Sequence, residues 1–269
     1  MTRRDTYFED DSVLRRVHSE RALALSGPRA LLLQATHPVA WAGFFASTGS
    51  LDEPYERLQR TAQVMDTIAF GPRDKADRAT RRVRAMHSRV RGELTEPAGH
   101  WPAGTPYAAD DPELLLWILA ALADSALVVY ERYVAPLPRD DRDAYWQDYR
   151  QIGRLFALRD ADMPDTIEDF DAYMAGMIAG DDLFVTDDAR ELAIRIVMRP
   201  PVPLWARPLL ETANQITVGL LPPAVRRMYG FRWDPAREAA LRGGAEYTRR
   251  VLLPLLPDRL RRAGRAGAT

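Results

Sequence analysis

Apolar residues recur at helical spacing along nearly the whole sequence, and proline and glycine interrupt this pattern. The clearest breaks are Gly27-Pro28, Gly71-Pro72 and the run from Arg199 to Pro203. Proline lacks the N–H that a helix interior needs, and glycine favours helix ends. No stretch of convincing length alternates apolar and polar residues as a strand does. We therefore predict an all-α fold, a single globular domain of about eleven helices.

A chain of 269 residues fits one large domain, and its apolar share of 46% is ample for a core. We place this all-helical domain at residues 10–260. Residues 1–9 are polar and are expected to form a flexible N-terminus. Residues 261–269 are expected to form a disordered tail.

The most apolar run, Leu114 to Ala123, is ten residues long and is followed by Asp124. That is too short to cross a bilayer core of about 30 Å, so we expect a buried helix and no transmembrane segment. Asp124 then needs a partner, because burying a lone carboxylate is costly. A structural pair with an arginine is the favoured partner. The alternative is a ring N–H of His37 or His87.

Several classes of protein are disfavoured by composition. Charged residues make up 28% of the chain but leave a net charge of −1, whereas nucleic-acid binders usually have a basic excess. The lack of cysteine excludes disulfides and thiolate metal sites. No HExxH, GxGxxG, P-loop or GxSxG motif occurs. The N-terminus has no apolar signal segment, so the expected location is cytoplasmic.

The richest set of candidate functional residues lies between residues 57 and 92, in two helical patterns joined by Gly71-Pro72. Arg57, Arg60 and Thr61 occupy positions i, i+3 and i+4, so they line one strip of the first helix. Unpaired buried charges are strongly unfavourable. We therefore expect Arg60 to reach solvent or nearby acids, and Arg57 to face an anionic ligand.

The second helix is expected to extend to about Arg91 and to contain His87 among arginines. Arg84 and Arg91, at i−3 and i+4, flank His87 on the helix surface and disfavour its protonation. A neutral imidazole is the form that binds iron or another metal. Arginines also suit the propionates of haem as bidentate partners. A solvated basic face with a partly buried histidine explains the pattern equally well.

The other histidines have simpler interpretations. His18 lies on an amphipathic helix and His100 in a polar loop, so both are expected to be solvated. His37 precedes Pro38 in an apolar segment, where the proline should break the helix. We expect His37 to be a core histidine bonded to a carbonyl at this break, with cofactor binding as the alternative.

Four segments together resemble a known family: RALLLQATHPVAWAGF, RLQRTAQVMDTIAFG, RRVRAMHSRVRG and YAADDPELLLWILAALADS. The family includes the latex-clearing rubber oxygenases and the fungal oxygenases of mycophenolic acid biosynthesis, and the resemblance covers roughly residues 20–250. Rubber oxygenases are all-helical and bind haem b through a histidine, which His87 matches. Their active-site arginine and threonine match Arg57 and Thr61.

Two positions depart from the rubber enzymes. These enzymes have a lysine just before the threonine, where this chain has Arg60, and a guanidinium stays protonated and is not expected to ligate iron. They also use a glutamate upstream of the arginine as a base, but the matching region around Trp41 has no carboxylate. These departures weaken the case for polyisoprene cleavage more than the case for haem.

The resemblance thus implies a haem b-dependent oxygenase that uses dioxygen on an apolar small molecule, such as an isoprenoid or another olefin. The alternative is a non-enzymatic helical protein that binds haem or a hydrophobic ligand. The implied roles are iron ligation by His87, catalysis by Arg57, Arg60 and Thr61, and cofactor binding by Arg57, Arg84, Arg91 and His37. The expected apolar surroundings of the substrate are Trp41, Phe44, Phe45, Leu115 and Trp117.

Overall fold

A computed structural model describes residues 5–47 and 54–262, with the side chains of 5–44 and 59–262. The prediction of an all-α fold is confirmed, because within these ranges one short two-stranded hairpin is the only sheet. The elements up to residue 108 are α1 (Val13–His18), η1 (Arg21–Leu25), α2 (Ser26–Gln34), α3 (Pro38–Ser47), α4 (Pro54–Phe70), α5 (Arg73–His87), β1 (Arg91–Glu93) and β2 (Pro106–Ala108). Those that follow are α6 (Pro112–Tyr133), α7 (Arg139–Leu155), η2 (Asp160–Asp162), α8 (Ile167–Ala179), α9 (Asp187–Met198), η3 (Leu204–Ala206), α10 (Arg207–Leu220), α11 (Pro223–Met228), α12 (Pro235–Tyr247), η4 (Thr248–Leu252), α13 (Leu253–Leu255) and α14 (Asp258–Arg261).

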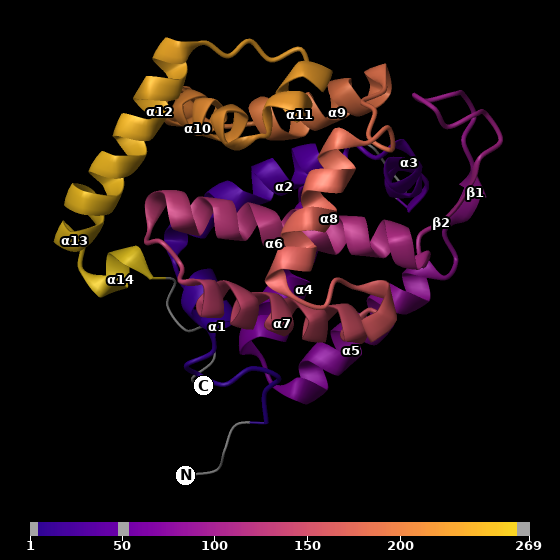
Figure 1. Cartoon of the computed structure of the whole chain (residues 1–269), viewed down its shortest axis with the longest axis horizontal. Helices are drawn as coiled ribbons and strands as arrows, with labels where there is room; N and C mark the ends of the chain where they lie inside the picture. Colours follow the sequence, from indigo (N-terminus) through magenta and orange to yellow (C-terminus); the bar gives the residue numbers. More distant parts are fainter. Residues whose placement is uncertain (1–4, 48–53, 263–269) are drawn as a thin grey trace.

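The long helix α6 lies at the centre of the molecule, with α2 packed along it (Figure 1). Asp111 caps its N-terminus by accepting hydrogen bonds from the N–H groups of Glu113 and Leu114, at 2.9 and 3.4 Å. Pro112 follows in the first turn, where its missing N–H does no harm. By length and composition α6 could cross a membrane, yet 61% of its most apolar window is buried inside the fold. That burial agrees with the core helix expected from the sequence.

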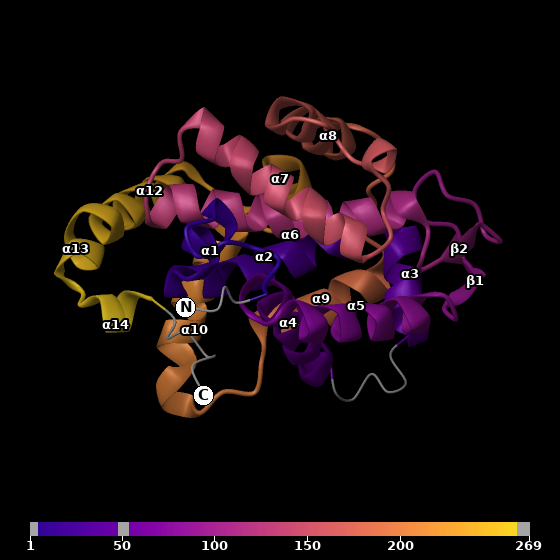
Figure 2. The ribbon, with the colours of Figure 1, turned by 90° about the horizontal axis from the view of Figure 1, so that it is seen from below.

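The remaining helices cover α2 and α6 on both sides. Figure 2 shows α7 and α8 on one side of this central pair and α4, α5, α9 and α10 on the other. Trp146 of α7 stacks on Phe170 of α8, with ring centroids 4.2 Å apart, and both side chains are fully buried. The apolar core is therefore continuous across the layers.

Asp124 of α6 forms an ion pair with Arg29 of α2, as the sequence predicted. The Arg29 Nη1 atom lies 2.7 Å from Asp124 Oδ2 and also donates to Ser125 Oγ at 2.8 Å. Arg29 Nε donates to the carbonyl of Leu220 at 2.9 Å. This buried guanidinium thus joins α2, α6 and α10, which explains how a carboxylate is tolerated in so apolar a helix.

The structure corrects the expected end of the second hairpin helix. We predicted a helix to about Arg91, but α5 ends at His87 and Arg91 begins β1, which pairs antiparallel with β2. Gly92 lies under the ring of Tyr107, where a Cβ atom would come within 2.5 Å of the phenol oxygen. Strand pairing and this close approach therefore replace the last helical turn.

The described part of the N-terminus packs onto the domain. Phe8 is buried in the core, and the Tyr7 hydroxyl donates to Asp77 of α5. The N–H of Arg73 donates to the carbonyl of Asp5 at 2.7 Å. Residues 1–4 and 263–269, which belong to the predicted flexible end and tail, lie outside the described residues, and the proposed domain limits stay a prediction.

Candidate functional site

Helices α4 and α5 form an antiparallel hairpin that is buried only near its turn. Next to Gly71-Pro72 the side chains of Ile68, Ala69, Ala76 and Thr80 are buried. Apolar residues recur at helical spacing along both helices and form a stripe on each, which in α5 includes Ala76, Val83 and Met86. Burial stops after the first turns on each side, and this leaves the other end of the hairpin to be explained.

That other end, residues 59–67 of α4 and 81–89 of α5, contains no buried residue. We call it the open half of the hairpin. Because the helices run antiparallel, these two stretches lie opposite each other. The stripe residue Met86 is 42% exposed here. Apolar side chains left uncovered on facing helices are typical of a surface that binds a ligand or another protein.

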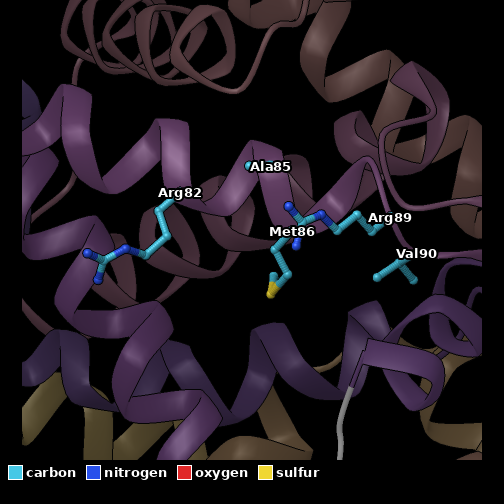
Figure 3. Close-up of a pocket in the computed structure, with 5 residues that line it drawn as sticks. All are labelled: Arg82, Ala85, Met86, Arg89 and Val90. Atoms are coloured by element: carbon cyan, nitrogen blue, oxygen red, sulfur yellow. The ribbon is translucent and has the colours of Figure 1, made fainter.

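A pocket of about 440 Å³, open to solvent, lies against the open half. The described residues that line it are Arg82, Ala85, Met86, Arg89 and Val90. In Figure 3 the side chains of Arg82 and Met86 point from α5 into this space, and the Arg89 guanidinium lies near Met86. The volume is within the range of about 300–1,000 Å³ of small-molecule sites. Two guanidiniums beside three apolar side chains, with no acid among them, suit an apolar ligand with anionic groups.

His87 is the last residue of α5 and is half-buried. It follows Met86, which lines the pocket. Successive side chains on a helix are about 100° apart around the axis, so the His87 side chain points about 100° away from that of Met86. The His87 carbonyl accepts a hydrogen bond from the N–H of Val90, another lining residue, at 3.0 Å. The ring is therefore neither in the core nor directed wholly into solvent. His87 is next to a lining residue in the sequence but is not itself among the described residues that line the pocket.

The structure brings only some of the predicted site residues together. Arg60 and Thr61 lie in the open half of α4 and are exposed. Arg84 is exposed on α5 but is not among the described lining residues. Arg57 belongs to α4, but its side chain, like that of Phe45, lies outside the described side chains.

Arg91 does not flank His87 on a helix, so this part of the prediction is wrong. It lies in β1, and its Nη2 atom pairs with Asp110 Oδ2 at 2.8 Å. The sequence analysis missed the two arginines that do line the pocket, Arg82 and Arg89. Arg82 shares a helix face with Met86, four residues further on, whereas Arg89 lies in the turn after α5. The spacing of Arg82 and Met86 is a signal that could have identified Arg82, but no helical spacing identifies Arg89.

His37 is a core histidine, as we favoured, but its partner differs from the prediction. It precedes α3 and is buried, and its Nδ1 atom accepts a hydrogen bond from the N–H of Ala40 at 3.4 Å, whereas we expected the ring to donate to a carbonyl. Its ring lies 5.6 Å from that of Trp101. The helix break thus uses the imidazole as a cap. His37 is not among the described residues that line the pocket.

His18 was expected to be solvated, and this prediction is wrong. Its ring stacks on Tyr145 of α7, and its Nε2 atom lies 3.1 Å from the Tyr145 hydroxyl and 3.4 Å from that of Tyr149. Burial lowers the pKa of His18 to about 4, and burial likewise lowers the pKa of His37 to about 4. Both rings are therefore neutral in the folded protein at neutral pH.

We expect these two histidines to make the protein less stable in acid. The unfolded chain takes up protons below about pH 6.5, whereas the folded chain does so only near pH 4, so protonation favours unfolding. The contribution of the two neutral histidines to the free energy of unfolding is complete above pH 6.5 and is lost as the pH falls towards 4. At pH 5 the free energy of unfolding should fall by about 2 kcal/mol per histidine. Urea denaturation at pH 7 and pH 5 measures this.

The variant His18→Phe isolates one of the two contributions. Phenylalanine keeps a ring between Tyr145 and Tyr149 but cannot titrate. The fall in stability between pH 7 and pH 5 should therefore be about 2 kcal/mol smaller than in the wild type. An equal fall in both proteins would show that His18 does not contribute.

The aromatic residues expected around the substrate belong to the core. Trp117 is fully buried, and Trp41 is buried and stacks on Phe44 with ring centroids 4.2 Å apart. None of the described residues in this set lines the pocket. In the described part of the chain no three His, Asp or Glu side chains converge as a metal site. A haem site needs only one axial protein ligand, so this does not decide whether haem binds.

Comparison with known proteins places these observations in context. A family model described as "ER-bound oxygenase mpaB/B'/Rubber oxygenase, catalytic domain" matches residues 15–250. Uncharacterised proteins of Mycobacterium bovis and Mycobacterium tuberculosis are each 27% identical to this chain over 189 residues, which is 69% of the chain and 69% of each relative. No solved structure matches the chain significantly.

Proposed function

Because the chain belongs to the ER-bound oxygenase mpaB/B'/rubber oxygenase family, we propose that it is an oxygenase that binds haem b against α5. Its substrate is an apolar small molecule, such as an isoprenoid or another olefin, and its co-substrate is dioxygen. The observation that best supports this is the pocket in the open half of the hairpin. It is lined by guanidiniums and apolar side chains and lies next to the half-buried His87.

The residues around the pocket fit haem by their chemistry. Haem is a flat apolar ring with two carboxylates at one edge. Met86, Ala85 and Val90 offer apolar contact, and Arg82 and Arg89 offer donors for carboxylates. His87, on the same helix, supplies the one imidazole that an axial site requires. Arg82 and Arg89 thus take the role that the sequence analysis gave to Arg84 and Arg91.

Bound haem would supply the redox-active iron that dioxygen chemistry requires. The chain's own residues have three tasks. His87 would supply an imidazole nitrogen as the ligand, and the pocket arginines would orient the group. Thr61, on the facing helix, has a hydroxyl that can donate a hydrogen bond to an oxygen atom. Arg60 stays protonated and contributes charge rather than a ligand.

One observation favours the second candidate, a haem or hydrophobic-ligand carrier without oxygenase activity. Rubber enzymes have a glutamate base in the region that here contains Trp41. Trp41 and Phe44 form a stacked apolar pair in this chain. An apolar pair cannot accept a proton, so a mechanism that needs this base is disfavoured. An oxygenase would then need a different group to take up the proton.

The visible spectrum of protein purified with added haem tests the proposal. We expect a Soret band that co-elutes with the protein, and dioxygen uptake when an isoprenoid is added. A Soret band without uptake for any isoprenoid or olefin tested would favour the carrier. If the protein elutes without haem under every supplementation, the haem-dependent oxygenase and the haem carrier are both wrong, and only a carrier of another hydrophobic ligand remains.

A further inference from the structure

The C-terminal segment from α12 to α14 exposes an unusual number of large apolar side chains. Leu255 is 76% exposed and Leu260 55%. The same segment also exposes Tyr247, Val251, Leu252 and Leu256. Single exposed leucines are ordinary on protein surfaces, but six large apolar side chains within fourteen residues are not. Such a surface marks an interaction site.

This exposure does not arise from a loose chain end. Leu253 faces inward and is buried. Arg261 of α14 pairs with the buried Glu20, with Nη2 2.9 Å from Oε1. The Arg21 side chain donates to the carbonyl of Arg262 at 3.1 Å. The segment is therefore fixed to the body of the protein on both sides of Leu260, with its leucines directed outward.

A second exposed group lies at the start of α10. Trp205 is 81% exposed, and Leu204 and Leu209 are each 72% exposed. Helix α10 packs against α12. In Figures 1 and 2 alike, α10, α13 and α14 lie toward the same end of the longest axis of the molecule, but Figure 1 shows α10 well above α14, so the two exposed groups are separate patches at this end. We call the two patches together the terminal surface: Leu204, Trp205 and Leu209 form one, and Leu252, Leu255, Leu256 and Leu260 form the other.

The terminal surface is bordered by arginines. Residues 249–262 contain five arginines and one aspartate. Arg249 and Arg250 share Glu246 as their ion-pair partner, and Arg261 and Arg262 share Glu20, so positive charge remains in excess at both places. The fifth arginine, Arg259, is exposed. Arg199 and Arg207, on either side of Trp205 in the sequence, are also exposed. Leucine and tryptophan bordered by arginine are typical of segments that lie in the headgroup region of an anionic membrane.

We propose that the terminal surface docks the protein onto an anionic lipid bilayer without spanning it. The leucines and Trp205 enter the boundary between headgroups and acyl chains, and the arginines contact lipid phosphates. A second copy of the chain is a less suitable partner. A two-fold interface would bring together the positive excess of two copies, and like charges repel.

Binding to phospholipid vesicles tests this directly. The full-length protein should sediment with vesicles of phosphatidylcholine and phosphatidylglycerol, much less with phosphatidylcholine alone, and less at high salt. The double variant Leu255→Glu, Leu260→Glu should bind at least about 10-fold more weakly. Arg259→Glu, an exposed change that leaves the apolar residues intact, should bind about 5-fold more weakly, and only to the anionic vesicles.

Phe184→Glu is the matched control. Phe184 is 43% exposed, close to Leu252 and Leu256, but it lies against Gly99 in the β1–β2 connection. This variant should bind vesicles as the wild type does. Absence of binding by the wild type, or an equal loss in Phe184→Glu, would overturn the proposal. Sedimentation equilibrium gives a further test, because a wild-type dimer that Leu255→Glu, Leu260→Glu dissociates would assign the surface to a second copy.

Discussion

Replacing His87 with glycine is expected to abolish the Soret band of protein purified with haem. The variant removes the one imidazole that lies beside the pocket on α5. Loss of outer-shell partners alone lowers metal affinity by about 10- to 100-fold, so loss of the ligand itself should lower haem affinity by at least about 100-fold. Titration of the apoprotein with haem, followed at the Soret maximum, measures the change.

Free imidazole should restore the band in His87→Gly. His87 is only half-buried, so a small ligand can reach the space that glycine leaves. A rescued spectrum would show that the variant is folded and that only the ligand is missing. His100→Ala and His37→Ala are the controls: His100 is exposed in the loop after β1, and His37 is buried outside the pocket lining. Loss of the band in His37→Ala, but not in His87→Gly, would move the ligand to His37 and overturn our assignment.

The fold could be predicted from the sequence where its signals are local. Helical spacing and proline breaks depend on neighbours within a few residues, so the all-α class and the break before Pro38 were predictable. The partner of Asp124 could be predicted by type, because a buried carboxylate needs a cation. The identity of this cation, Arg29, could not be predicted, because Arg29 and Asp124 are 95 positions apart in the sequence.

The errors concern contacts that are distant in sequence. Strands of three residues are too short to show alternation, so the pairing of β1 with β2 had no visible signal. His18 looked solvated because its own helix is amphipathic, but Tyr145 of α7 lies against it from 127 positions away. In both cases another segment determined the environment of the residue.

The candidate site was predicted in part for the same reason. The helical hairpin was predicted from spacing, whereas the role of His87 rests on the resemblance and stays a prediction. The arginines were chosen as helical neighbours of His87, and this rule gave Arg84 and Arg91. Which face of α5 borders a pocket depends on how the hairpin packs on the rest of the fold, and the open half presents Arg82 and Arg89 instead.

The double variant Arg82→Ala, Arg89→Ala is expected to bind haem about 30-fold more weakly than the wild type. A charge-assisted hydrogen bond contributes about 1.5–3 kcal/mol when sheltered, and an open pocket reduces this to about 1 kcal/mol for each arginine. Spectrophotometric titration of the apoprotein gives the dissociation constant. The loss of affinity should come from the contacts with the haem carboxylates, because Arg82 and Arg89 are the only charged side chains among the described residues that line the pocket.

Arg81→Ala, Arg84→Ala is the matched control for this effect. It likewise removes two positive charges near the end of α5, and all four arginines are exposed, but neither Arg81 nor Arg84 is among the described residues that line the pocket. Its haem affinity should stay within about 3-fold of the wild type, because a screened charge outside the pocket attracts the ligand only weakly. Equal losses in the two double variants would mean that the net charge of α5, and not the pocket, attracts the ligand.

Haem dimethyl ester separates carboxylate binding from a change in pocket shape. The ester lacks the anionic groups, so the wild type should bind it more weakly than haem. The Arg82→Ala, Arg89→Ala variant should then bind the ester as well as the wild type does, because no carboxylate remains for the arginines to hold. If this variant loses affinity for the ester and for haem alike, the two arginines shape the apolar wall of the pocket. The propionates would then have to be held by other residues.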